Sequence, residues 1–193
     1  MNTVHLGDAY DFMKKDILRV LKVGLKKSIY VLPMFTDEFK GEYLTFYKNL
    51  TSYEEETDDK IKEIVIKGEN RRNYFNDPNL NDYIVFIDPN TGIKDSYGWN
   101  YIHYDEIEMV ARNNNFLVIY DQSFDRRKDR KKEIESKLKS LKDKNLHAFY
   151  LNAQTSFAFI SKNEELLNRA KCLLINQVAL SCRLIPDDKN HVK

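Results

Sequence analysis

The chain has 193 residues, with 31 Lys and Arg against 30 Asp and Glu. Its net charge is therefore only +1, and the overall charge indicates no particular class of partner. Hydrophobic residues make up 42% of the chain and aromatic residues 12%, which excludes a disordered protein. This length fits one domain, and we expect a single domain over residues 1–193.

Several common classes of protein are excluded by what the sequence lacks. Its two cysteines, Cys172 and Cys182, are too few for a zinc knuckle or a disulfide framework. No apolar run approaches the roughly 20 residues of a membrane span. The N-terminal residues have neither the basic start nor the apolar core of a secretory signal, so we expect a cytoplasmic protein that does not bind a membrane.

Hydrophobic periodicity divides the chain into alternating helices and strands. In chain order we expect a helix over 9–26, a strand over 28–34, a helix over 43–50, a strand or helix over 61–66, a strand over 82–88, a helix over 104–113, a strand over 116–120, a helix over 129–144, strands over 147–151 and 156–160, and a helix over 164–181. This order predicts an α/β fold: a Rossmann-like three-layer sandwich with a mainly parallel sheet and a C-terminal antiparallel hairpin.

Acidic residues follow two of the most apolar strands. Asp88 comes at the end of one strand and Asp121 directly after the next. Because ligands bind beyond the carboxyl ends of parallel strands, we expect the two side chains to lie together and to share Mg²⁺ or Mn²⁺. The alternative is that both acids cap turns or helices. The polar residues after each acid, which we expect to line the same pocket, are Asn90, Thr91, Gln122 and Ser123.

The N-terminal stretch is a second candidate. Asp8, Asp11 and Lys14 are spaced three apart, so they share one face of a helix. Two acids and a lysine suit a site for a metal and a phosphate. A capped, charge-paired helix start explains the same residues.

A basic run opens the helix expected over 129–144. Six of the seven residues from Arg126 to Lys132 are Lys or Arg. Such a run suits the phosphate backbone of a nucleic acid, although a solvated surface helix has the same pattern. The residues that we expect to contact nucleic acid are Arg126, Arg127, Lys128, Arg130 and Lys131.

The chain resembles a bacterial protein family without an assigned activity. The stretches that carry the resemblance are 7–14, 71–75, 84–93 and 118–122, in the same order. In that family a buried strand ends in Asp-Pro-Asp-Asn/Thr-Gly, and Asp88 to Gly92 is similar to this motif.

A more distant similarity is to the adenine-N6 RNA methyltransferases with a Rossmann-like fold. Their N-terminal His-x-Gly-Asn-x-x-Asp-x-x-Lys stretch is similar to residues 5–14, and their Asp-Pro-Pro-Tyr motif begins as Asp88-Pro89 does. Asn90 and Thr91 stand where that family has the proline and the aromatic residue. The resemblance implies S-adenosylmethionine as an alternative cofactor, with Asp88 accepting a hydrogen bond from the base amine.

These observations leave three hypotheses. The first is a magnesium-dependent nuclease, a phosphodiester hydrolase in which Asp88 and Asp121 hold the metal, Asp8 or Asp11 contributes, and Lys14 stabilises phosphate charge. The second is a relative of the methyltransferases. The third is a non-catalytic module that binds nucleic acid or protein, such as a defence-associated partner or an inhibitor. All three allow a homodimer or another protein partner.

Overall fold

The computed structural model describes residues 9–35, 41–51, 59–64, 66, 70–152, 155–177 and 183–186. Its main sheet has seven strands in the order β2-β1-β3-β6-β8-β7-β9. The bounds of these strands are β1 (Ile29–Pro33), β2 (Lys60–Ile61), β3 (Ile84–Asp88), β6 (Phe116–Tyr120), β7 (His147–Asn152), β8 (Ser156–Ser161) and β9 (Arg183–Pro186).

The strand directions confirm the predicted fold class. Strands β2, β1, β3 and β6 pair in parallel, and the β7–β8 hairpin adds antiparallel strands beside β6. Strand β9 then pairs antiparallel with β7. The ends of β1, β3 and β6 therefore meet at one edge of the sheet, which we call the carboxyl edge.

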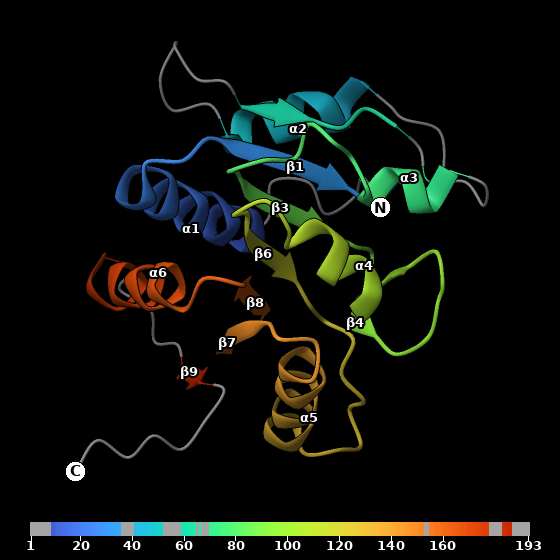
Figure 1. The fold of residues 1–193 in the computed structure, drawn as a ribbon, viewed down its shortest axis with the longest axis vertical. Coiled ribbons are helices and arrows are strands. Elements are labelled where there is room, and N and C mark those ends of the chain that lie inside the picture. Colours follow the sequence, from blue (N-terminus) through green and yellow to red (C-terminus); the bar gives the residue numbers. More distant parts are fainter. Residues whose placement is uncertain are drawn as a thin grey trace.

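Helices cover both faces of this sheet, as the prediction of three layers requires. The helices are α1 (Ala9–Leu25), α2 (Gly41–Thr51), α3 (Arg71–Phe75), α4 (Tyr104–Val110), α5 (Arg130–Lys142) and α6 (Glu164–Gln177). Figure 1 shows α1 and α6 on one side of the strands and α4 and α5 on the other. Each face has its own apolar core, because alternate strand residues point in opposite directions: Phe86 and Val118 pack with α1, whereas Ile87 and Ile119 pack with α4 and α5.

A small second sheet lies in the connection between β3 and α4. It consists of β4 (Gly92–Lys94) and β5 (Tyr101–His103), which pair in parallel and are joined by residues 95–100. The connection must bring the chain back to the starting end of β4 before β5 begins. Six residues can span this distance because each strand is only three residues long. Ile93 and Ile102 are buried, so the small sheet packs on the same core as α4.

Some local features differ from the expectations. The stretch 71–75 forms a helix, and β4, β5 and β9 are strands that the apolar pattern does not reveal. Helix α4 ends at Val110, short of residue 113, because the chain turns there to begin β6. The end of the helix expected over 164–181 lies partly outside the described residues.

Tyr74 of α3 allows a test of this packing. It is buried, and its hydroxyl donates a 3.0 Å hydrogen bond to the carbonyl oxygen of Pro33 at the end of β1. The pKa of Tyr74 is raised well above its ordinary value of 10.0, chiefly by burial and to a smaller extent by the electrostatic effect of the neighbouring Tyr30. The unfolded chain releases this proton near pH 10, whereas the folded chain keeps it.

The stability that depends on this proton is therefore complete below pH 10 and falls as the pH rises further. We expect the Tyr74→Phe variant to lose its free energy of unfolding less steeply above pH 10, by about 1.4 kcal/mol per pH unit. Urea unfolding of both proteins at several alkaline pH values measures the two slopes. Equal slopes would contradict the burial of an un-ionised Tyr74.

Candidate functional site

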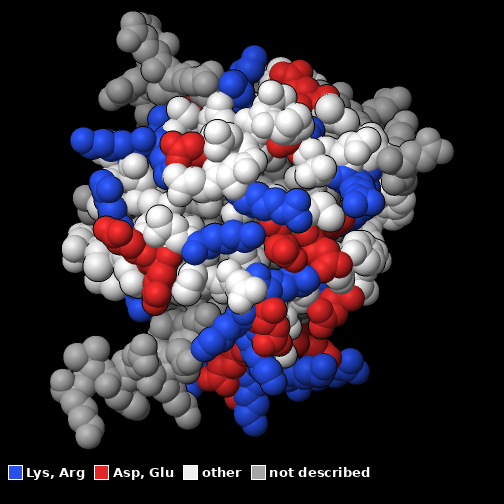
Figure 2. Space-filling model, in the orientation of Figure 1, with Lys and Arg blue, Asp and Glu red and all other residues white. Residues whose placement is uncertain are grey.

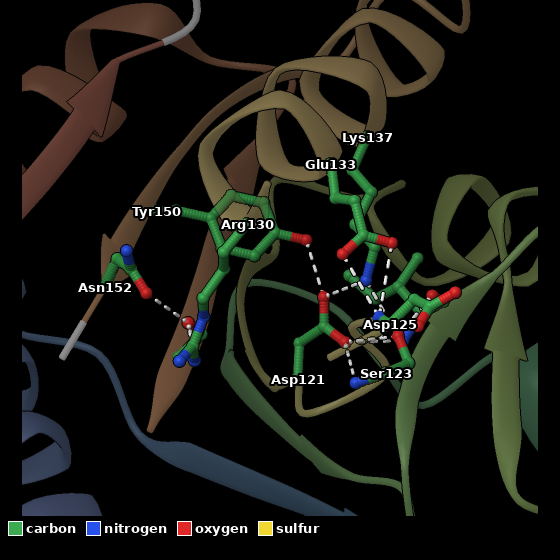
Figure 3. Close-up of polar contacts among 10 residues, drawn as sticks. Asp121, Ser123, Asp125, Arg130, Glu133, Lys137, Tyr150 and Asn152 are labelled. Atoms are coloured by element: carbon green, nitrogen blue, oxygen red, sulfur yellow. Dashed lines mark hydrogen bonds and ion pairs between the residues drawn. The ribbon is translucent and has the colours of Figure 1, made fainter. Parts of the chain in front are cut away.

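The carboxylate of Asp121, at the carboxyl edge of β6, is the centre of a buried polar cluster (Figure 3). Asp121 is 0% exposed. Its Oδ2 accepts hydrogen bonds from Lys137 Nζ at 2.6 Å and from the Tyr150 hydroxyl at 2.9 Å. Its Oδ1 accepts from the backbone nitrogens of Ile93 and Ser123, each at 3.1 Å, and lies 2.6 Å from Ser123 Oγ. One carboxylate thus joins β4, α5 and β7 to the end of β6.

Gly92 allows the chain to pass this close to Asp121. Its φ of 138° is in a region that glycine adopts and other residues rarely do. A Cβ atom at position 92 would lie 2.0 Å from Asp121 Oδ1 and 2.9 Å from Asp121 Cα. The close approach of the Asp121 carboxylate therefore requires glycine at position 92, at the end of the Asp88–Gly92 turn.

Lys137 reaches Asp121 because it lies on the buried stripe of α5. Ile134, Leu138 and Leu141 are buried on this helix, and Lys137, three residues after Ile134, faces the same way. Burial lowers the pKa of Lys137, and the attraction of Asp121 offsets this only in part. A buried ion pair matters for stability chiefly because removing one partner leaves the other charge buried without compensation.

Asp88 is the centre of a second cluster on α1 and α2. Its Oδ2 accepts a 3.1 Å hydrogen bond from Lys14 Nζ and a 2.8 Å hydrogen bond from the Tyr47 hydroxyl. Lys14 also lies 3.3 Å from Asp11 Oδ1, and its Nζ is 4.6 Å from the centre of the Tyr120 ring. Burial alone would lower the pKa of Lys14, but the charges of Asp88 and Asp11 outweigh burial and raise it. Lys14 therefore stays charged and neutralises Asp88.

The two strand-end acids do not lie together, which corrects the sequence-based expectation. Ile87 is level with Ile119 in the pairing of β3 and β6, so Asp88 is level with Tyr120, and Asp121 comes one residue later. A shift of one residue turns a strand side chain to the opposite face. Asp88 accordingly contacts α1 and α2, whereas Asp121 contacts α5.

This arrangement does not favour a metal shared by Asp88 and Asp121. Each acid has a lysine at 3.1 Å or closer and a tyrosine hydroxyl at 2.9 Å or closer. Within the described part of the chain, no three His, Cys, Asp or Glu side chains come together as a metal site. Binding of Mg²⁺ or Mn²⁺ stays a prediction, and Asp8 lies outside the described residues.

The basic run divides into exposed side chains and one that turns inward. Arg126, Lys128 and Lys131 are exposed, and Arg127 is exposed with a fork of hydrogen bonds to Asp125. Figure 2 shows basic and acidic side chains mixed over the part of this face where α5 lies. The run is thus a mixed surface with basic residues in excess at the N-terminal end of α5.

Arg130 is the member that turns toward the sheet. Its Nη2 donates a 2.7 Å hydrogen bond to Ser156 Oγ, which in turn donates to Asn152 Oδ1 at 3.0 Å. The Arg130 guanidinium also lies 4.8 Å from the centre of the Phe124 ring. Arg130 therefore connects the basic run to the carboxyl edge, where β7 ends and β8 begins.

Three residues of the segments at this edge each have a buried polar atom with no hydrogen-bond partner among the described residues. The atoms are Arg130 Nε, Gln122 Nε2 and Thr155 Oγ1, and we call these residues the edge polar group. The segments that carry them adjoin at this edge, because Asp121 N donates to the carbonyl of Ser156 and Arg130 Nη2 donates to Ser156 Oγ. Buried polar atoms are paired in most proteins, so an unpaired set of this kind points to a ligand or to ordered water.

The other residues expected to line a pocket have smaller roles. Asn90 is exposed, and its Nδ2 donates a 3.0 Å hydrogen bond to Asn100 Oδ1. The backbone of Thr91 accepts from Gln122 N and donates to the carbonyl of Asn100. These contacts fasten the turn after β3 to the segment after β6. Ser123 belongs to the Asp121 cluster.

Comparisons of the chain with protein-family models, with curated proteins and with solved structures gave no significant match. The suspected families therefore remain interpretations of the sequence. None of the described helices is both long enough and apolar enough to cross a membrane.

Sequence reasoning missed three side chains that define these clusters. Lys137 has a visible signal, since a lysine three residues after Ile134 falls on the apolar stripe of its own helix. Tyr47 and Tyr150 have none, because a buried tyrosine in an apolar element is typical of an ordinary core.

The Asp121–Lys137 pair can be tested against an exposed pair on the same helix. We expect Lys137→Met to lower the free energy of unfolding by about 3–5 kcal/mol, because the buried Asp121 would lose its ion-pair partner. Lys131 lies 3.8 Å from Glu135, with side chains 66% and 54% exposed, and serves as the control. Lys131→Met should change the free energy of unfolding by less than about 0.5 kcal/mol. Urea unfolding measures both, and similar effects would show that the buried pair is not structural.

Proposed function

We propose that the protein is a nucleic-acid-binding module that holds a phosphate group at the carboxyl edge of its sheet. The observation that carries this proposal is the edge polar group, in which Arg130, Gln122 and Thr155 have buried atoms without partners. A phosphate oxygen accepts hydrogen bonds from guanidinium, amide and hydroxyl groups alike. The exposed Arg126, Lys128 and Lys131 of the basic run would then contact the neighbouring phosphates of the nucleic acid.

The proposal does not assign catalysis to the two strand-end acids. A hydrolase of the first hypothesis needs carboxylates that can release their present partners and hold a metal together. Asp88 and Asp121 face opposite layers, and each is neutralised by a buried lysine. A binding role requires neither acid to change its partners. A cytoplasmic location is also part of this proposal.

The salt dependence of binding tests this assignment. We expect a labelled single-stranded oligonucleotide to bind with an affinity that falls steeply as salt rises. The double variant Arg126→Ala/Lys128→Ala should bind more weakly, and its plot of log affinity against log salt should be shallower by about 0.7 for each phosphate that the variant no longer neutralises. Fluorescence anisotropy at several salt concentrations measures the slope.

A matched control removes the same two charges at the opposite edge of the sheet. Arg112, between α4 and β6, and Lys162, directly after β8, are both exposed there. The Arg112→Ala/Lys162→Ala variant should keep the slope of the parent protein. Equal reductions of the slope in both double variants, or no binding by the parent, would overturn the proposal.

One observation favours the methyltransferase relative as a second candidate. Lys14 contacts Asp88, so the two stretches that carry that resemblance meet in space. They meet near the ends of β1 and β3. Strand β2 lies on one side of β1 and β3 lies on the other, so the strand order reverses at β1, and open α/β sheets bind ligands at such a reversal. The end of β1 opposes this candidate, because Met34 and Phe35 are buried where a glycine-rich turn would receive the cofactor.

Thermal unfolding with S-adenosylhomocysteine separates the two candidates. Under the nucleic-acid-binding proposal, millimolar S-adenosylhomocysteine leaves the Tm unchanged. For the second candidate, a ligand at a hundred times its Kd would add about 2.7 kcal/mol, which is roughly 5–11 °C for a chain of this size. A rise of that size that disappears in Asp88→Asn would establish the second candidate. Parallel titrations with Mg²⁺ and Mn²⁺ test the metal prediction.

A further inference from the structure

Tyr97 and Trp99 are two exposed aromatic side chains, and we call them the aromatic surface. The Tyr97 side chain is 65% exposed and the Trp99 side chain 48% exposed, and both belong to the connection 95–100 between β4 and β5. Among the side chains whose exposure the structure describes, the only other large aromatic one exposed to this degree is Phe12 on α1. Exposed aromatic side chains this close together in the chain are available for contact with a partner.

Tyr97 is held in place by the residues behind it. Its ring stacks on His103, with ring centres 4.0 Å apart and planes at 18°, and its hydroxyl donates to Asp105 Oδ2 at 2.8 Å. His103 in turn caps α4, where its Nδ1 accepts from Asp105 N and its backbone nitrogen donates to Glu106. One face of the Tyr97 ring is thus backed by a fixed imidazole, which preorganises the other face for a flat partner.

The connection is also fastened to the carboxyl edge. Asn100 receives hydrogen bonds from Thr91 N and from Asn90 Nδ2, at 2.9 Å and 3.0 Å. Thr91 is joined by its carbonyl to Gln122 of the edge polar group. The aromatic surface and the proposed phosphate site therefore belong to one connected piece of structure.

Two lysines lie close to the aromatic surface. Lys94 lies with its Nζ 4.3 Å from the centre of the Tyr101 ring, and Lys144 Nζ lies 2.5 Å from Asp105 Oδ1. Lys144 is shared by Asp105, which accepts from the Tyr97 hydroxyl, and by Glu108, whose Oε2 lies 3.5 Å from Lys144 Nζ. The Lys144 contact also joins the aromatic surface to the segment after α5.

We infer that Tyr97 and Trp99 form a stacking surface for unpaired bases, so that the ligand is a single-stranded nucleic acid rather than a duplex. This inference rests on the proposed function and extends it from phosphate contacts to base contacts. Aromatic side chains next to a basic surface are how proteins hold single strands without reading their sequence, because every base has a π face. In a duplex the bases are stacked on one another and cannot reach Tyr97 or Trp99.

The chain provides its own probe, because Trp99 is its only tryptophan. We expect a single-stranded oligonucleotide of about 12 nucleotides to quench the tryptophan fluorescence. A duplex of the same sequence, and an abasic single strand with the same phosphates, should quench little. Anisotropy of the labelled strand should show weaker binding by Tyr97→Ala and by Trp99→Ala, each by about 5- to 150-fold, the range for one stacked base.

Two further variants separate stacking from general damage. Trp99→Phe keeps an aromatic ring, so it should bind within a few-fold of the parent protein although its fluorescence signal disappears. Phe12→Ala removes an equally exposed ring from α1 and should bind as the parent does. Thermal unfolding confirms that all four variants fold.

The outcomes distinguish this inference from the function on which it rests. Salt-dependent binding that Tyr97→Ala, Trp99→Ala and removal of the bases leave unchanged would overturn the stacking surface and leave the phosphate site standing. A preference for the duplex would also overturn it. A parent protein that binds neither strand nor duplex would overturn both, and the exposed rings would then be a surface for another protein.

Discussion

The buried carboxylate of Asp121 is the group on which the carboxyl edge depends. It takes hydrogen bonds from β4, from α5 and from β7, three elements that do not otherwise form one sheet or one layer. Gly92 passes too close to it for a Cβ atom, and Lys137 donates to it from the buried stripe of α5. The same convergence positions Gln122 and Arg130, since one follows Asp121 in sequence and the other begins the helix that carries Lys137. The proposed phosphate site is in this sense built on a structural ion pair.

The fold follows from the sequence wherever hydrophobic periodicity decides the structure. The strands 84–88 and 116–120 and the helices 9–25 and 130–142 are strongly patterned, and the structure has them with bounds close to those expected. Strands β4 and β5 are three residues long, which is too short for an alternating pattern to be recognised, and their pairing depends on contacts with the larger sheet. Helix α3 is likewise short, and its order comes from burying Tyr74 and Phe75.

The sequence indicates the candidate site only in part. It places polar residues at the carboxyl ends of β3 and β6. These ends share one edge of the sheet, because the order of strands and helices in the chain makes the two strands parallel. It cannot give the register of β3 against β6, and the one-residue offset between Asp88 and Asp121 decides which layer each acid faces. Lys14 and Asp88 are expected in one site and do meet, and Arg130 joins the basic run to the sheet. Tyr97 and Trp99 carry no motif, and only their exposure in the folded chain draws attention to them.

The donors that converge on Asp121 also have a consequence for local unfolding. If α5, the β4–β5 sheet or β7 were to detach alone, the carboxylate of Asp121 would lose a hydrogen-bond partner, which makes a partial opening unfavourable. Their amide hydrogens are therefore expected to exchange as a group, with a common opening free energy, rather than from the surface inward. Such a cooperative unit presents the basic run and the aromatic rings at fixed relative positions, so a bound strand would meet a rigid surface and would itself supply the flexibility.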